Sequence, residues 1–248
     1  MASLGIAERC DLIDQIELPP VEHHTAPDER EVRYSEGDTE GKVIGGSVMR
    51  QEKSLSPQQQ TDVAYSTLLA QLAADSKDKG HSVEWYREYM RVMSLIGWRS
   101  EKLDFSEIHG KLGQKLSEII LNLLSSILSA EQIKDLEIIL NSLKDPQNVE
   151  SNFLFNKKAA SGTNATFQIS DAYIGTRGGA AMHFLASQFN GKREILDVLG
   201  IKFDSSSMSM YMSVSQFELN EDIYGGVREQ VRAKLGDRAK TEIKGIQI

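Results

Sequence analysis

Two residues in the second half of the chain could work as an acid-base pair. Asp171 and His183 flank residues 176–179, whose Thr-Arg-Gly-Gly sequence is typical of a tight turn because glycine accepts positive φ angles. If the flanking segments pair as antiparallel strands, the carboxylate lies close to the imidazole, and a histidine oriented in this way is a common general base. No serine or cysteine nucleophile stands out beside them, so a histidine with a structural role is the simpler interpretation.

The same turn could bind an anion. The backbone amides of residues 175–179 could form a concave nest, with Arg177 as the charge partner. The lysine of a phosphate-binding P-loop is missing, and the segment does not lead into an expected helix. We therefore predict a hairpin turn here and keep Arg177 as a candidate binding residue.

Methionine recurs at every second position in Met208, Met210 and Met212. Thioether groups on one strand face can bind soft ions such as Cu(I). No cysteine or histidine lies nearby in the sequence, and methionine is an adaptable filler of apolar cores. His23 and His24 are adjacent, so their side chains diverge on regular structure and do not indicate a site. The sequence predicts neither a metal site nor a cofactor.

These methionines belong to a segment of period-two alternation, which predicts a β-strand over residues 207–217. Residues 163–170 alternate in the same way, residues 181–189 follow as a return strand, and residues 153–155 are expected to start the sheet. Together they predict an antiparallel sheet with one apolar and one hydroxyl-rich face. On the last strand, the apolar face would carry Met208, Met210, Met212 and Val214, and the other face Ser209, Tyr211 and Ser213.

The small polar side chains on one face of this sheet need an explanation beyond contact with water. Such a face suits the lumen of a pore built from amphipathic hairpins whose other face meets lipid. It also suits a flat platform that packs against another sheet, a partner or a carbohydrate. The first alternative makes the residues from Met208 to Val214 on the apolar face candidates for lipid contact. The second makes Ser209, Tyr211 and Ser213 candidates for binding.

Helix signals occupy the chain before and after this sheet. Capping boxes open two helices at Ser56 and Ser129, each serine being followed three residues later by glutamine. An aromatic stripe that includes Trp85 and Tyr89 predicts a buried face on another helix. Asn220 is the expected N-cap of a last helix.

Residues 111–128 and 129–144 are expected to form a strongly apolar helical hairpin. One interpretation is an ordinary buried layer packed on the sheet. The other is a hairpin that detaches and enters a membrane interface, although neither helix has an apolar stretch long enough to span a bilayer.

The predicted fold class is α+β, with an N-terminal helical layer of about four helices packed on a mainly antiparallel β-sheet and a C-terminal helix. Residues 1–55 are expected to form an irregular arm, because prolines and polar acidic residues interrupt them. Residues 56–248 are expected to form a single α+β domain. Its helical part covers 56–145, its β part 150–219, and the last helix and an isoleucine-rich tail 220–248.

The composition excludes several classes of protein. Of 248 residues, 40% are hydrophobic and 26% are charged, as in ordinary globular proteins. The formal net charge of -8 argues against nucleic acid as a partner, because phosphate binding needs clustered lysine and arginine. Cys10 is the only cysteine, which leaves no intrachain disulfide. Residues 1–15 lack the apolar run of a signal peptide, so we expect synthesis as a soluble cytoplasmic protein, with later release left open.

In outline, helices followed by serine- and threonine-rich amphipathic hairpins resemble some soluble pore-forming toxins. The leading hypothesis is a non-catalytic interaction protein, because a serine-rich strand face and a strongly apolar helical hairpin occur together without a recognisable catalytic set. In its sharpest form, this protein self-associates and acts on membrane lipid. Two alternatives stay open. One is a small-ligand-binding protein or enzyme with a pocket between helices and sheet, near His183, Asp171 and Arg177. The other is a structural subunit of a larger assembly. An enzyme is less favoured, since no catalytic set is recognisable.

Overall fold

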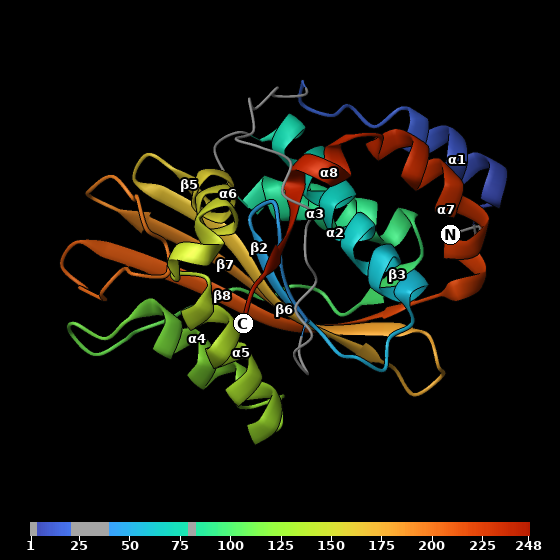
Figure 1. The fold of residues 1–248 in the computed structure, drawn as a ribbon. Helices are drawn as coiled ribbons and strands as arrows, with labels where there is room; N and C mark the ends of the chain where they lie inside the picture. Colours follow the sequence, from blue (N-terminus) through green and yellow to red (C-terminus); the bar gives the residue numbers. More distant parts are fainter. Residues whose placement is uncertain (1–3, 21–39, 79–82) are drawn as a thin grey trace.

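The computed structural model describes residues 4–20, 40–78 and 83–248 and shows a mixed α+β protein (Figure 1). The strands are β1 (Glu40–Ile44), β2 (Ser47–Gln51), β3 (Trp98–Ser100), β4 (Ser106–Glu107), β5 (Ala160–Ser161), β6 (Asn164–Ile174), β7 (Ala180–Gly191), β8 (Met208–Leu219) and β9 (Ile243–Ile246). They form one sheet in the order β3-β8-β7-β6-β2-β1-β9, in which β4 also pairs with β8 and β5 with β6. Among these described strands, β2 and β6 pair in parallel and the other pairs are antiparallel, so the predicted sheet type is confirmed.

Helices lie against both faces of this sheet. They are α1 (Ile6–Asp14), α2 (Pro57–Lys77), α3 (Val83–Leu95), α4 (Leu116–Leu124), α5 (Ala130–Ser142), α6 (Val149–Ala159), α7 (Glu221–Leu235) and α8 (Arg238–Glu242). One apolar core joins α1, α2, α3 and α7 to strand residues such as Ile44 and Phe184. A second core joins α4, α5 and α6 to the neighbouring residues Val43 and Leu185. Because successive side chains of a strand point to opposite faces, the sheet is covered on both sides, which differs from the predicted single N-terminal layer.

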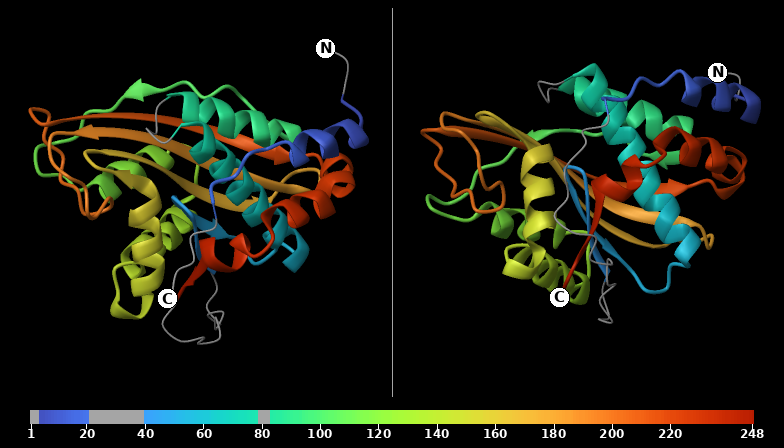
Figure 2. Two further views of the ribbon diagram at one scale, coloured as in Figure 1. Left: turned by 90° about the horizontal axis from the view of Figure 1, so that it is seen from above. Right: turned by 45° about the horizontal axis from the view of Figure 1, so that its top comes forward.

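The three longest strands, β6, β7 and β8, run side by side across the molecule (Figures 1 and 2). Their alternating pattern predicts them correctly, and the glycine turn joins β6 to β7 with Gly178 at a φ of 79°. In the resulting register Asp171 lies opposite His183, and His183 opposite Gln216. The register therefore places the predicted acid-base pair on adjacent strands.

The predicted helix starts are also present. Ser56 and Ser129 each accept a hydrogen bond from the backbone N–H of the glutamine three residues later, which completes both capping boxes. The Asn220 side chain accepts from the backbone N–H groups of two residues in the first turn of α7. Trp85 and Tyr89 are 2% and 0% exposed, so the aromatic stripe of α3 is buried in the core as predicted.

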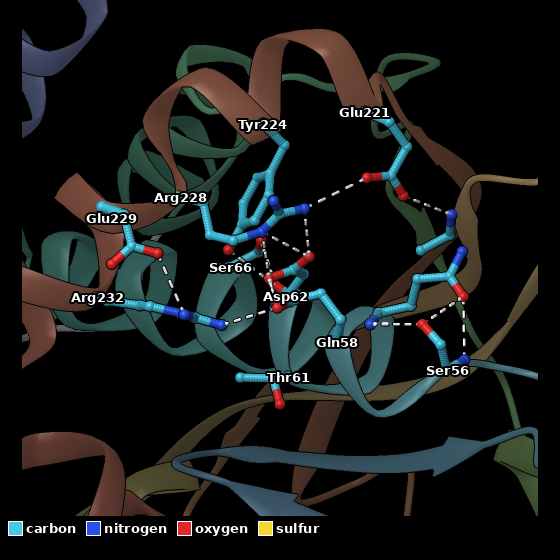
Figure 3. Close-up of polar contacts among 12 residues, drawn as sticks. Ser56, Gln58, Thr61, Asp62, Ser66, Glu221, Tyr224, Arg228, Glu229 and Arg232 are labelled. Carbon is cyan, nitrogen blue, oxygen red and sulfur yellow. Dashed lines mark hydrogen bonds and ion pairs between the residues drawn. The ribbon is translucent and has the colours of Figure 1, made fainter.

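A buried ion pair fastens α2 to α7 (Figure 3). Asp62 of α2 is 1% exposed, and its carboxylate accepts hydrogen bonds from Arg228 Nε at 3.1 Å and Nη2 at 2.9 Å. Gln58 donates to the same carboxylate at 2.7 Å. The Tyr224 hydroxyl donates to the Asp62 backbone oxygen at 3.2 Å. This arrangement satisfies a charge that burial would otherwise make costly.

The first 55 residues contain more regular structure than their composition predicts. In their described part, α1 packs on α7, and β1 and β2 form a hairpin within the sheet. Gly45, with a φ of 50°, makes the tight turn between the two strands. His23 and His24 lie outside the described residues. The isoleucine-rich tail forms β9, which pairs with β1 at the edge of the sheet, as expected.

The segment predicted to start the sheet is helical instead. Phe153, Leu154 and Phe155 belong to α6, in which Leu154 and Phe155 are buried and Phe153 is 63% exposed. A run of three apolar residues has no period of its own, so it does not separate a strand from a helix segment. The strand that follows this helix is β5, which pairs with β6.

Candidate functional site

One half of the β6–β8 sheet is amphipathic. We call this region the amphipathic half-sheet and define it as residues 164–169, 185–190 and 209–214. Its rungs alternate between the two faces, because the register aligns residues of like polarity. The polar rungs are Asn164–Asn190–Ser209, Thr166–Gln188–Tyr211 and Gln168–Ala186–Ser213. The apolar rungs are Ala165–Phe189–Met210, Phe167–Ser187–Met212 and Ile169–Leu185–Val214. Ala186 and Ser187 are the exceptions to the pattern.

The apolar face of the amphipathic half-sheet is covered by α4, α5 and α6. Met210 and Met212 are 1% and 3% exposed and belong to the same core as residues of all three helices. Met208 is half-buried and packs against this core, while Val214 is 36% exposed at its margin. The four residues predicted as candidates for lipid contact thus lie on one face, beneath the core formed with α4, α5 and α6 or at its edge.

The polar face is partly covered by α2 and α3. Gln168 is fully buried, and its Oε1 accepts hydrogen bonds from Ser47 Oγ at 2.8 Å and from Gln71 Nε2 at 3.0 Å. Its Nε2 donates to the Tyr86 hydroxyl at 3.2 Å. Burial raises the pKa of Tyr86 above its ordinary value, and the hydrogen bond from Gln168 opposes that shift. This network satisfies the polar side chains at the centre of the face.

Toward the start of β8 the polar face becomes more accessible. Ser213 is buried, and its Oγ accepts a hydrogen bond from the Asp104 backbone N–H at 2.9 Å. Ser209 and Tyr211 are half-exposed, and Asn190 on the adjoining strand is exposed. The three predicted binding candidates on β8 therefore follow one strand from a covered position to an open one.

Arg177 lies at the opposite end of these strands. It is exposed on the turn between β6 and β7, beside a hollow of 230 Å³ that is also lined by Arg99 and Glu221. Ser209 lies near the start of β8, whereas this turn is beside the end of β8. The structure does not bring Arg177 together with Ser209, Tyr211 and Ser213 in one site.

An arginine cluster fastens α5 to the sheet. We call Arg50, Gln132, Asp135 and Asp171 the Arg50 cluster. Arg50 Nη1 donates to Asp171 Oδ1, while Arg50 Nε and Nη2 contact Asp135 Oδ2 at 3.1 and 3.0 Å. Gln132 Nε2 donates to Asp171 Oδ2 at 2.9 Å. Burial opposes the charge of Arg50, but its two carboxylate partners outweigh that effect and raise its pKa.

Local sequence explains why Gln132 faces Asp171. Gln132 is the third residue of α5, and its amide oxygen accepts from the Ser129 backbone N–H at 2.9 Å to close the capping box. The amide nitrogen is then free to reach the strand. Sequence reasoning missed Arg50 and Asp135. The available signal was an arginine within the strand that carries Val48 and Met49, because such a position needs a buried acid.

His183 contacts this cluster from the neighbouring strand. Its Nδ1 lies 3.5 Å from Asp171 Oδ2, and its ring stacks on Tyr173 with the ring centres 4.6 Å apart. The Asp171 carboxylate already accepts hydrogen bonds from Arg50 and Gln132. Among the residues that the structure describes, His183 has no hydrogen bond to a serine or cysteine. The arrangement suits a structural histidine at the edge of an ionic cluster better than a nucleophile-activating base.

Two cavities lie beside these elements. An open cleft of 580 Å³ is lined by His183, Val214, Gln216 and Ile127. A cavity of 730 Å³ lies between α3 and the 98–105 segment, with Met90 and Met93 in its lining. Sequence reasoning missed the second cavity, because the 98–105 segment has no regular period and its position on α3 is a long-range contact.

Within the described part of the chain, no cluster of three or more histidine, cysteine, aspartate or glutamate residues is arranged to hold a metal ion. None of the described helices combines the length and the apolar character needed to cross a membrane. The polar groups that the structure does bring together are those of the Arg50 cluster and of the network around Gln168.

Comparison with known proteins gives structural neighbours of low similarity. No protein family matches the chain, and no curated protein matches its sequence. A delta-endotoxin structure aligns over 84% of this chain and 96% of its own, with 13% identity and a TM-score of 0.41. The Evf virulence factor aligns over 82% and 85%, with 11% identity and a TM-score of 0.40. Activated Cyt2Ba from Bacillus thuringiensis subsp. israelensis aligns over 71% and 98%, with 11% identity and a TM-score of 0.41. Likeness at this level establishes neither a family nor an activity for the chain.

Proposed function

We propose that this protein is a non-catalytic, membrane-active protein that self-associates on lipid and presents the apolar face of its amphipathic half-sheet to the bilayer. The observation that carries the proposal is the register of β6, β7 and β8, which separates polar from apolar side chains rung by rung. In the folded chain, α4, α5 and α6 occupy the place that lipid would take. Membrane action then requires these helices, beginning with the α4–α5 hairpin, to leave the sheet.

The strands have a suitable length for this role. β6, β7 and β8 contain 11, 12 and 12 residues. A tilted strand needs about 9–11 residues to cross the hydrocarbon layer. No new strand has to form, because the three strands are already paired in the folded protein.

Exposure of the apolar face to lipid costs little compared with its exposure to water. Side chains such as Phe167, Phe189 and Met210 exchange one apolar contact for another when lipid replaces a helix. The ionic contacts of Arg50 with Asp135 are different, because they break when α5 leaves. The Arg50 cluster therefore acts as the latch that holds the hairpin closed in this proposal.

Self-association follows from the same geometry. In the folded chain β6 is paired with β2 and β5, and β8 with β3 and β4. Once β6, β7 and β8 separate from these strands, their sheet has open edges, and unpaired backbone groups are strongly disfavoured in hydrocarbon. Several copies of β6–β8 would pair their edges into a closed barrel. The polar rungs, which include Thr166 and Gln188, would then line its interior.

A disulfide between α5 and β1 tests whether the hairpin must move. A Cβ atom built on Gly41 lies 3.0 Å from Cγ2 and 3.1 Å from Cγ1 of Ile139. This proximity places the two Cβ atoms about 3.5 Å apart, at the short end of the range of a disulfide. The variant Gly41→Cys/Ile139→Cys, made in a Cys10→Ser background, locks the hairpin to the sheet when it is oxidised.

Release of calcein from phospholipid vesicles is the readout, and the reduced form of the same protein is the matched control. We expect the reduced form to release the dye and to yield an oligomer on light scattering, and the oxidised form to do neither. Equal release by the two forms would refute opening at α5. No release by the wild-type protein from any vesicle would refute membrane action itself.

The 730 Å³ cavity supports the alternative of a small-ligand-binding protein. Its lining is mainly apolar and includes Trp98, Leu103 and Phe105, so an apolar ligand would fit it better than a polar substrate. This cavity lies on the α3 side of the sheet, away from the α4–α5 hairpin. The two functions therefore involve different surfaces.

A further inference from the structure

Two loops at one end of the molecule each present an exposed leucine. Leu112 is 83% exposed and Leu196 is 78% exposed. Figure 2 shows the segment before α4 beside the connection between β7 and β8, at the end where the strands project beyond the helices. Isolated leucines on a surface are common, but two on adjoining loops indicate a surface that meets an apolar partner.

Backbone hydrogen bonds join the two loops into one unit. The N–H of Gly113 donates to the Phe203 oxygen at 2.8 Å, and the N–H of Phe203 donates to the Gln114 oxygen at 2.8 Å. The N–H of Leu116 donates to the Ile201 oxygen at 2.9 Å. We call residues 110–116 and 192–204 the paired loops. Their mutual hydrogen bonds fix the surface in place without help from a partner.

Basic residues surround the two leucines. Lys111, Lys115, Arg193 and Lys202 are exposed, and none of them forms an ion pair within the described residues. Lys192 adds a fifth basic residue and donates to the Ser206 backbone oxygen. All five lie on the paired loops, whose backbones meet at Lys115 and Lys202, in a chain with a formal net charge of -8.

Two acidic side chains of the same loops have ionic or hydrogen-bond partners. Asp197 contacts Lys144 at 3.8 Å and accepts a hydrogen bond from the Gly200 backbone N–H. Asp204 accepts hydrogen bonds from the hydroxyls of Ser206 and Ser207. A hollow of 380 Å³ lies within the 192–204 loop and contains both acidic and basic side chains. Glu194 is exposed and is a third acid in these loops, so the paired loops carry five basic and three acidic residues, an excess of two positive charges.

We propose that the paired loops dock on the surface of a membrane that contains anionic phospholipid. The proposal rests on the function proposed above and names the lipid class that its first contact requires. Leu112 and Leu196 enter the interface, and the surrounding lysines and arginine contact the headgroup phosphates. A soluble anion would satisfy the basic residues but not the leucines, so lipid fits the whole surface better.

The position of the paired loops relates docking to the proposed contact of the amphipathic half-sheet with the bilayer. The connection from 192 to 207 joins β7 to β8 directly at the rung of Gly191 and Met208. The next rung, Asn190 with Ser209, is the first of the amphipathic half-sheet. Docking at this end brings the amphipathic half-sheet to the membrane end-on. The net charge of -8 does not prevent this, because salt screens charges that lie more than about 8 Å away.

Vesicle cosedimentation tests the inference. The probes are phosphatidylcholine vesicles, alone or with about one third phosphatidylglycerol. The first variant is Leu112→Ser/Leu196→Ser, and the second is Lys111→Ser/Lys115→Ser. The matched control is Ile174→Ser/Arg177→Ser, which removes an exposed apolar and an exposed basic side chain at the opposite end of β6.

We expect the wild-type protein and the control to bind the anionic vesicles, and to bind pure phosphatidylcholine more weakly. The leucine variant should lose affinity for the anionic vesicles about tenfold or more. The lysine variant should lose about fivefold per residue on anionic vesicles and little on neutral ones. Circular dichroism should show unchanged folding, because every substituted side chain in the two loop variants is exposed.

Three results would overturn the inference: wild-type binding that does not depend on the anionic lipid, loop variants that bind as wild type, or an equal loss in the control. Dye release separates this outcome from failure of the proposed function. If loop variants bind and release dye normally, docking through the paired loops is wrong and membrane action stands. If wild type docks through the loops but never releases dye, the docking stands and the proposed function fails.

Discussion

Replacement of Arg50 by methionine should loosen α5 and increase membrane activity. Methionine keeps much of the apolar stem but removes the cation from Asp171, whose side chain is 1% exposed. Removal of one partner from a buried ion pair costs about 3–5 kcal/mol. Asp171 keeps the hydrogen bond from Gln132 at 2.9 Å and the contact with His183 at 3.5 Å. We therefore expect a loss near the lower limit, about 3 kcal/mol of unfolding free energy.

Urea unfolding measures this loss, and hydrogen exchange locates it. With a denaturant slope of about 3 kcal/mol per molar, the midpoint should fall by about 1 M. Amide protons of α5 should exchange faster in native buffer, since Arg50 is the residue that joins Asp135 to the sheet. Dye release from vesicles should be faster than with the wild-type protein.

Arg228→Met is the matched control for this experiment. The substitution removes the cation from another buried acid, Asp62. The ion pair that is lost joins α2 to α7 and does not involve α5 (Figure 3). Arg228 is more exposed than Arg50, at 24% against 9%, so the expected loss is slightly smaller, about 2–3 kcal/mol. General destabilisation would increase dye release in both variants. If the two variants release dye equally fast, or if α5 exchanges at the wild-type rate in Arg50→Met, the latch function of the Arg50 cluster is refuted.

Two further predictions concern the core. Met212→Ala should lower the free energy of unfolding by about 2–5 kcal/mol and Val214→Ala by less than about 1 kcal/mol, because these residues of one strand face are 3% and 36% exposed. Equal losses in urea unfolding would contradict the coverage of this face in solution. Burial raises the pKa values of Tyr86, Tyr89 and Tyr224, so the unfolded chain releases these protons first, and stability should be intact below about pH 10 and fall above it. Each buried tyrosine contributes up to about 1.4 kcal/mol per pH unit to this fall, and urea midpoints that stay constant between about pH 9 and 11 would contradict the result.

Local patterns predicted the elements whose determinants lie within a few residues. The alternation from Met208 to Phe217 predicts β8 because no helix repeats with period two. Ser56 and Ser129 predict helix starts because a capping box uses atoms only three residues apart. The register of β6 with β7 was also predictable from the sequence, since a short glycine turn fixes the pairing of the strands that it joins.

Contacts between distant segments were not predictable in this way. Arg50 and Asp171 are 121 positions apart and meet because β2 joins the sheet in parallel with β6. The alternation of β8 shows that its two faces differ, but it does not show what lies against them. Thus Met210 and Ser213 were correctly assigned to opposite faces, and the 111–144 hairpin was expected to pack on the sheet. Which face the hairpin covers, and the 98–105 segment beside Ser213, were not identified.

The helices on the two faces of the sheet differ in how they are attached, and this difference predicts which of them would leave in the proposed membrane action. On the α3 side, the Tyr86 hydroxyl lies 3.0 Å from the Phe167 backbone oxygen and 3.1 Å from the Ser187 backbone oxygen, the two acceptors for its one proton, and it accepts from the Ser187 N–H at 3.0 Å. Departure of α3 would leave buried backbone groups between β6 and β7 without their partner, at about 1–3 kcal/mol each. On the other side, α5 makes its ionic contact with the sheet through Asp135, and most of the hairpin's contact with the sheet is between apolar side chains. Further polar contacts of the hairpin, from Leu116 and Lys144, go to the 192–204 loop and not to the sheet. Lipid can replace apolar contacts but cannot supply the hydrogen bonds of Tyr86, so the sheet should open at the α4–α5 hairpin while α3 stays in place.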